Sequence, residues 1–146
     1  MGHEEIEILL VEDNLHDAEM TIRSLQKNKL ANNVVHLKDG ASAYDFLMGK
    51  REFEMRDINQ KPKLILLDLK MPKMDGIELL EIIKGDPRTK KIPVVVLTSS
   101  KEDPDIEKCY QLGVNSYIVK PVDFENFSRI VSELSLYWIL TNQHPT

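Results

Sequence analysis

The stretch Leu64-Ile65-Leu66-Leu67-Asp68 is a short run of apolar residues that ends on a single carboxylate. A continuous apolar run of this length, without alternation, is typical of a strand buried on both faces of a parallel sheet. Three other runs have the same form and also end on polar side chains: 8–11 before Glu12 and Asp13, 94–97 before Thr98, and 117–119 before Lys120. A weaker run at 34–37 predicts a fifth strand nearer an edge of the sheet.

Helices are predicted between these runs, because each interval carries a residue that can cap a helix. The predicted N-caps are Asn14, Asp75, Asp103 and Asp123. The helix after Asn14 is predicted to run to about residue 28, and Asp103 stands before a proline, which suits the first helical position. Strand and helix thus alternate along the chain, which predicts an α/β fold with right-handed crossovers. The polar segment 49–63 is predicted to be a helix extension or a surface loop.

The length and composition of the chain exclude several classes of protein. Its 146 residues, 42% hydrophobic and 29% charged, predict one globular domain over 1–146 with its core at about 6–140. A net charge of −5 argues against nucleic acid as a partner, and no apolar run reaches the ~20 residues of a membrane span. The N-terminus lacks the basic start and apolar core of a signal peptide. The single cysteine, Cys109, is expected to pack rather than react, and a cytoplasmic location is expected.

The polar residues at the strand ends are expected to meet in one pocket. In open parallel sheets, ligands bind outside the carboxyl ends of the strands, near the point where the strand order reverses. The residues predicted to lie there are Glu12, Asp13, Asp68, Thr98 and Lys120. Three carboxylates in one pocket repel one another unless a cation lies among them, and carboxylate oxygens suit Mg²⁺. The pocket is therefore predicted to bind Mg²⁺.

The same residue types suit the transfer of a phosphoryl group. A carboxylate can attack phosphorus and form an acyl phosphate, while a divalent cation and an ammonium group stabilise the charge on the phosphoryl oxygens. Asp68 is the best candidate nucleophile, because it follows the central run and can lie between the metal side and the lysine side. Thr98 can donate its hydroxyl to the phosphoryl oxygens.

Over nearly its whole length, the chain resembles the receiver domains of two-component response regulators. The segments that carry the resemblance are Val11-Glu12-Asp13-Asn14, Leu67-Asp68-Leu69-Lys70-Met71-Pro72-Lys73-Met74-Asp75-Gly76, Leu97-Thr98-Ser99-Ser100, Leu112-Gly113-Val114-Asn115 and Tyr117-Ile118-Val119-Lys120-Pro121. The resemblance implies a flavodoxin-like, doubly wound fold, with five parallel strands in the order 2-1-3-4-5 and helices on both faces. It also implies a cis peptide bond between Lys120 and Pro121.

The resemblance further implies a role for each residue of the pocket. Asp68 would accept a phosphoryl group from a histidine kinase. The implied Mg²⁺ ligands are the carboxylates of Glu12, Asp13 and Asp68 and the backbone carbonyl of Lys70. Thr98 and Lys120 would contact the phosphoryl oxygens, Tyr117 would turn inward as Thr98 moves, and the side chain of Lys70 would influence the lifetime of the phosphoryl group. The chain would then be a phosphorylation-dependent switch rather than an enzyme, with no attached output domain.

Two features of the chain bear on its partners. The long segment before the third strand and the aromatic last helix resemble single-domain regulators paired with phytochrome-type kinases. A histidine kinase of that type is therefore the expected partner, together with an unidentified downstream protein. In the last helix, residues 136–140 are all apolar and cannot all face inward. Either the tail at 141–146 covers them, or they form a surface through which the chain associates as a homodimer.

Three other kinds of protein share parts of this pattern. An aspartyl-phosphate hydrolase of the haloacid-dehalogenase type also has an Asp at a strand end, but it needs a second Asp two residues later, where this chain has Lys70. A Rossmann or P-loop nucleotide binder needs a glycine-rich loop after the first strand, which this sequence lacks. An unphosphorylated pseudo-receiver, acting only as an interaction module, is not favoured because all five pocket residues are present.

Overall fold

Five parallel strands form one sheet in the computed structural model, which describes residues 8–27, 29 and 33–142, with side chains described up to residue 133. The strands are β1 (Ile8–Val11), β2 (Val34–Leu37), β3 (Leu64–Leu67), β4 (Val94–Thr98) and β5 (Ser116–Val119). Their order in the sheet is β2-β1-β3-β4-β5, and every neighbouring pair is parallel. The predicted flavodoxin-like order is thus confirmed, and β2 lies at an edge as predicted.

The central strands are buried on both faces, which explains their continuous apolar runs. Successive side chains of a strand point to opposite faces of the sheet. On one face, Leu9 of β1 and Val96 of β4 belong to one hydrophobic core, and on the other face Leu10 and Val95 belong to a second core. Each of these four side chains is at most 1% exposed. An alternating polar pattern would therefore place polar groups in one of the two cores.

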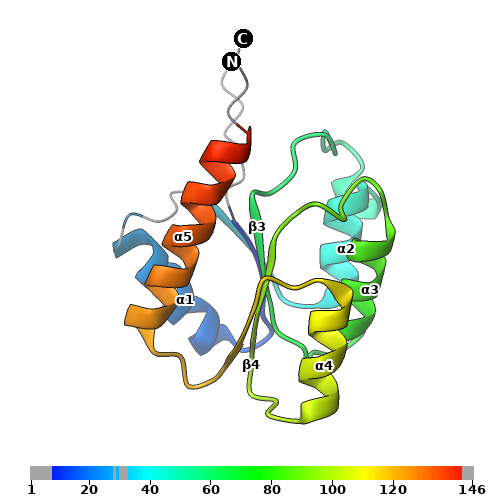
Figure 1. The fold of residues 1–146 in the computed structure, drawn as a ribbon. Helices are drawn as coiled ribbons and strands as arrows, with labels where there is room; N and C mark the ends of the chain where they lie inside the picture. The colour runs from blue at the N-terminus through cyan, green and yellow to red at the C-terminus, as the bar shows by residue number, and fades with distance from the viewer. Residues whose placement is uncertain (1–7, 28, 30–32, 143–146) are drawn as a thin grey trace.

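Helices supply the other half of each core (Figure 1). They are α1 (Leu15–Lys27), α2 (Gly40–Met48), α3 (Gly76–Gly85), α4 (Asp103–Leu112) and α5 (Phe124–Asn142), with a 3₁₀ helix η1 (Arg51–Phe53). In Figure 1, α1 and α5 lie together on one face of the sheet, and α2, α3 and α4 lie on the other. Within the described part of the chain, we find no helix with the length and apolar character needed to cross a bilayer.

Three of the four predicted helix caps are confirmed. The side chains of Asn14, Asp75 and Asp123 accept hydrogen bonds from backbone amides in the first turns of α1, α3 and α5. The predicted cap at Asp103 is wrong, because α4 already includes Asp103 and begins after Glu102. The Ser100 hydroxyl accepts a hydrogen bond from the Glu102 amide at 3.4 Å, so a side chain of the preceding loop satisfies that amide.

The segment 49–63 forms a loop that is fastened to α2 by one arginine. The Arg56 guanidinium lies 3.9 Å from the centre of the Phe46 ring, and it donates hydrogen bonds to the backbone carbonyls of Phe46 and Gln60. Phe53 of η1 packs edge-on against the same ring, with 5.2 Å between the ring centres. This aromatic–cation stack keeps the long segment before β3 against the rest of the domain.

The start of α3 lies directly against the backbone that follows β3. The Gly76 amide donates a hydrogen bond to the Leu69 carbonyl at 2.9 Å. A Cβ atom at Gly76 would lie 2.3 Å from the carbonyl oxygen of Asp68, a distance that no real Cβ contact has. Glycine therefore permits the close approach that fixes the position of Asp68.

Helix α5 continues to Asn142 and so includes the apolar residues 136–140. The side chains of these residues lie outside the described part of the structure. The predicted self-association surface on this helix therefore remains a prediction.

Candidate functional site

The carboxyl ends of four neighbouring strands bring the predicted residues to one edge of the sheet. Backbone hydrogen bonds hold these residues in register just past the strand ends. The Asp68 amide donates to the Val11 carbonyl at 3.0 Å, and the Lys120 amide donates to the Thr98 carbonyl at 2.8 Å. The Glu12 amide likewise donates to the end of β2, at 3.0 Å. The backbone hydrogen bonds of the sheet therefore fix the positions of the Cα atoms that carry these side chains.

Three of the predicted residues form an acidic cluster. Glu12, Asp13 and Asp68 each offer a carboxylate oxygen, and these oxygens lie within 4.8 Å of one another. Glu12 and Asp68 are buried, at 2% and 6% exposed, whereas Asp13 is open to solvent. The cluster can thus be reached from the Asp13 side.

Lys120 joins this cluster and also contacts a fourth acid that the sequence did not predict. Its ammonium lies 2.6 Å from Glu12 Oε1 and 3.5 Å from Asp68 Oδ2. It lies 2.8 Å from Asp17 Oδ2, in the first turn of α1. The peptide bond between Lys120 and Pro121 is cis, as predicted.

The electrostatics of the cluster follow from burial and from this lysine. Burial raises the pKa of Glu12 to about 7, with further increase from Asp68, while Lys120 opposes the shift. For Lys120, burial lowers the pKa, but the contacts with Asp17 and Glu12 outweigh this effect, so its pKa lies above the ordinary value. The lysine is therefore a fixed positive charge at neutral pH, in contact with carboxylates that are costly to bury.

On the other side of Asp68, Thr98 and Tyr117 both contact Ser100. Thr98 is completely buried, and its hydroxyl oxygen accepts a hydrogen bond from the Ser100 amide at 3.3 Å. The Tyr117 hydroxyl donates to the Ser100 carbonyl at 3.0 Å. The two residues predicted to act as a switch are thus connected through one residue of the β4–α4 loop.

The Lys70 side chain is linked to Ser100 through Asp105, in the first turn of α4. Its ammonium lies 3.6 Å from Asp105 Oδ2, and that oxygen also accepts a hydrogen bond from the Ser100 hydroxyl at 2.6 Å. The Lys70 amide donates to Asp68 Oδ1 at 3.3 Å. The loop after Asp68 and the loop after Thr98 are therefore joined by polar contacts.

A family model for the response regulator receiver domain matches residues 8–132, which include every residue of this site. The chain belongs to this family. It acts in two-component signalling as a receiver-domain response regulator, a class of proteins that are generally switches rather than enzymes.

Relatives of this receiver come from more than one signalling system. The probable methanogenesis regulatory protein FilR2 of Methanothrix harundinacea is 41% identical over 94% of this chain and 86% of its own length. Response regulator Rcp1 of Synechocystis sp. is 38% identical over 92% of this chain and 89% of its own length. The Mn²⁺-bound crystal structure of Rcp1 has a TM-score of 0.77 and 37% identity, covering 97% of this chain and 99% of that one. The phosphorylated cyanobacterial phytochrome response regulator RcpA has a TM-score of 0.73 and 39% identity, covering 98% and 100%.

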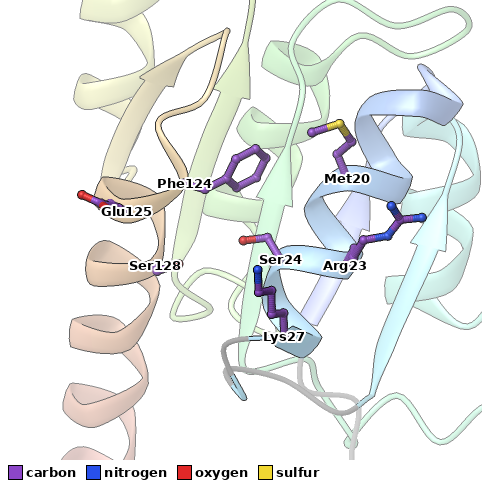
Figure 2. A pocket seen from close by; sticks show the side chains of 7 residues that line it. All are labelled: Met20, Arg23, Ser24, Lys27, Phe124, Glu125 and Ser128. Atoms are coloured by element: carbon purple, nitrogen blue, oxygen red, sulfur yellow. The ribbon is translucent and has the colours of Figure 1, made fainter.

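One surface cavity of the receiver adjoins the acidic cluster. It has a volume of about 500 Å³ and is lined by residues that include Asp13, Lys70 and Asp105. Another cavity, of about 570 Å³, lies between α1 and α5, away from the strand ends (Figure 2). In Figure 2, the Phe124 ring points from α5 toward α1, whereas Glu125 points to the outer side of α5. Of these two cavities, only the first is lined by a residue of the acidic cluster, Asp13.

Sequence reasoning missed the residues that act through helix and loop geometry. Asp17 lies three residues after a helix cap, where an acid is ordinary because it complements the helix dipole. Ser100 lies in a segment that carries the family resemblance but was given no role, and Asp105 carries no local pattern of its own. His36 has no ligand spacing in the sequence, but its Nε2 lies 2.8 Å from the Glu12 carbonyl and so supports the strand end from β2.

Proposed function

We propose that this receiver is a phosphorylation-dependent switch, in which Asp68 accepts a phosphoryl group from a histidine kinase. The observation that carries the proposal is the placement of Asp68. It is buried, its carboxylate belongs to a group of three acids whose oxygens lie within 4.8 Å of one another, and it contacts the Lys120 ammonium at 3.5 Å. We further propose that residues 1–146 work as one receiver domain, with its core at about 6–140.

The residues present fit a divalent metal ion. Opposite oxygen ligands of Mg²⁺ lie about 4.2 Å apart, so carboxylate oxygens within 4.8 Å of one another need only a small shift to share one ion. The proposed ligands are the carboxylates of Glu12, Asp13 and Asp68 and the backbone carbonyl of Lys70. When bound, Mg²⁺ supplies positive charge that offsets the charge of the phosphoryl oxygens. The Mn²⁺-bound form of the relative Rcp1 supports a divalent ion in this receiver.

The residues of the chain have separate tasks in the transfer. A carboxylate oxygen of Asp68 forms a bond to phosphorus as the bond between phosphorus and the histidine nitrogen of the kinase breaks, and the electron pair of that bond stays on the imidazole. Lys120 donates hydrogen bonds to the transferred oxygens as a compact positive charge. The Thr98 hydroxyl accepts from Ser100 and can still donate its own proton to a phosphoryl oxygen.

We expect phosphorylation to change the surface of the receiver through the hydrogen bonds that Thr98 and Tyr117 make with Ser100. If Thr98 moves toward the phosphoryl group, the loop that carries Ser100 and the hydroxyl of Tyr117 must rearrange with it. The two states would differ in population rather than by a new fold. The output is then a changed docking surface for a downstream protein, and no turnover of a separate substrate is needed.

The partner proposed for the input step is a histidine kinase of the phytochrome type, because the relative RcpA is a phytochrome response regulator. We expect the reaction to take place in the cytoplasm, where ATP is available to phosphorylate such kinases. Association through α5 is proposed on its apolar sequence at 136–140.

A metal requirement tests the proposed chemistry. Incubation with a small phosphodonor, such as acetyl phosphate, should add one phosphoryl group in the presence of Mg²⁺. In chelator the rate should fall by about 100-fold or more, because the charge of the phosphoryl oxygens is then unbalanced. Intact-protein mass spectrometry over time measures both rates. Equal rates with Mg²⁺ and with chelator would rule out the metal role of the acidic cluster.

Removing one acid should relieve the cluster when no metal is present. Two carboxylates ~5 Å apart repel by about 3 kcal/mol at an effective dielectric constant of 20, and exposure of Asp13 reduces this to ~1 kcal/mol. In chelator, Asp13→Asn should therefore raise the melting temperature by about 3 °C, and it should lose the further rise that Mg²⁺ gives the wild type.

Glu107→Gln is the matched control, because Glu107 is also exposed but lies on α4, outside the acidic cluster. It should leave the melting temperature and its Mg²⁺ dependence unchanged. A lower melting temperature for Asp13→Asn in chelator would contradict the repulsion described above.

A further inference from the structure

The ammonium of Lys120 has a carboxylate partner for each of its three N–H bonds. An ammonium group carries three donors and no acceptor. The short contacts of Lys120 are those with Glu12 at 2.6 Å and with Asp17 at 2.8 Å. The contact with Asp68, at 3.5 Å, is at the outer limit of a hydrogen bond. The ammonium therefore lies on the side of β1 and α1, and only loosely on Asp68.

The three carboxylates differ in how well water can replace the lysine. The side chains of Glu12 and Asp68 are 3% and 7% exposed, so each would be left as a poorly solvated charge. The side chain of Asp17 is 37% exposed. Among these three, Asp17 is the partner that can release the ammonium at the smallest cost.

We infer that Asp17 is a positioning residue, which holds the Lys120 ammonium back from Asp68 until a phosphoryl group arrives. The inference rests on the proposed function, in which Lys120 donates to the transferred oxygens. To move fully onto the phosphoryl oxygens at Asp68, the ammonium must give up one of its two short contacts, and the contact with Asp17 is the one it can leave at the smaller cost. The contact between Asp17 and Lys120 thus stabilises the resting state relative to the state that transfers phosphate.

The cap of α1 keeps Asp17 in place for this task. The Asp17 amide donates to the side chain of Asn14 at 3.0 Å, and the Asn14 amide donates to Glu12 Oε2 at 3.2 Å. The first turn of α1 and the end of β1 are therefore one hydrogen-bonded unit. Glu12, just past the end of β1, and Asp17, in the first turn of α1, both reach Lys120 from this unit.

The substitution Asp17→Asn should speed phosphorylation. With acetyl phosphate and Mg²⁺, we expect the rate of phosphoryl incorporation to rise about two- to fivefold, the range that an ion pair partly open to water supports. Asp17→Glu, which keeps the charge, should stay nearer the wild-type rate. Glu19→Gln is the matched control, because it removes an exposed acid from the same helix and should leave the rate unchanged.

A double-mutant cycle separates positioning from a general effect of charge. In a Lys120→Gln background, Asp17→Asn should no longer change the rate, because the residue it acts on is absent. An increase of the same size in both backgrounds would overturn the inference, as would an unchanged or slower rate for Asp17→Asn alone.

A measurement on the unphosphorylated protein gives an independent result. In protein labelled with ¹⁵N-lysine, the Lys120 ammonium should give a signal protected from exchange with water in the wild type and in Glu19→Gln, and this protection should be lost in Asp17→Asn. Unchanged protection in Asp17→Asn would overturn the inference. A wild type that takes up no phosphoryl group would instead contradict the proposed function, and the NMR signal would still decide whether Asp17 holds Lys120.

Discussion

Replacing Gly76 with alanine is expected to lower the free energy of unfolding by about 2–4 kcal/mol and to slow phosphorylation of the folded protein. The added Cβ would lie 2.3 Å from the Asp68 carbonyl oxygen and 2.6 Å from the Leu69 Cα. Both neighbours are backbone atoms, so no flexible side chain can move aside. Either α3 or the backbone of Asp68, the proposed phosphoacceptor, must shift. Urea denaturation, followed by the same mass-spectrometric assay, measures both effects.

Gly85→Ala is the matched control for this substitution. Gly85 is the last residue of the same helix, and a Cβ there would meet no atom within 4 Å. Alanine is the better helix former, so this variant should be as stable as the wild type or more stable by about 0.5 kcal/mol. If the two alanine variants had the same free energy of unfolding, the close approach of α3 to Asp68 would not contribute to the stability of the fold.

Replacing Asp68 with asparagine is expected to abolish phosphoryl incorporation. The amide has nearly the shape of the carboxylate but cannot form an acyl phosphate. Because one buried charge is removed from an acidic cluster, the fold should be retained, and a melting curve checks this.

Asp75→Asn makes the same chemical change close by. Asparagine caps helices as well as aspartate does, so α3 should still begin at Gly76 and phosphoryl incorporation should match the wild type. Phosphoryl incorporation by Asp68→Asn at the wild-type rate would show that another residue is the acceptor.

The sequence predicted the parts of the fold that depend on local pattern. The continuous apolar runs predicted the strands, because both faces of β1, β3 and β4 are buried. The rule for ligand sites in parallel sheets then placed Asp13 and Asp68 together, since both follow strands that are neighbours in the sheet. The order of the strands came from the family resemblance and not from the pattern itself.

The remaining features depend on contacts between elements, which a local pattern does not contain. Asp17 contacts Lys120 because the lysine side chain extends from the end of β5 to the first turn of α1, although the two residues are more than a hundred positions apart in the chain. The start of α4 was misplaced by one residue because the N-cap is Glu102, whose side chain accepts no capping hydrogen bond and so gives no cap pattern in the sequence. The packing of Arg56 on Phe46 is likewise a tertiary contact, within a segment whose sequence is mostly polar.

The central claim, that Asp68 is the phosphoacceptor, can be tested by locating the phosphoryl group directly. Borohydride reduces an aspartyl phosphate to homoserine, so the modified residue can be found by peptide mass mapping after reaction with acetyl phosphate and Mg²⁺. We predict homoserine at position 68 and unmodified carboxylates at Glu12, Asp13 and Asp17. Homoserine at position 13 or 17, with position 68 unchanged, would contradict this claim.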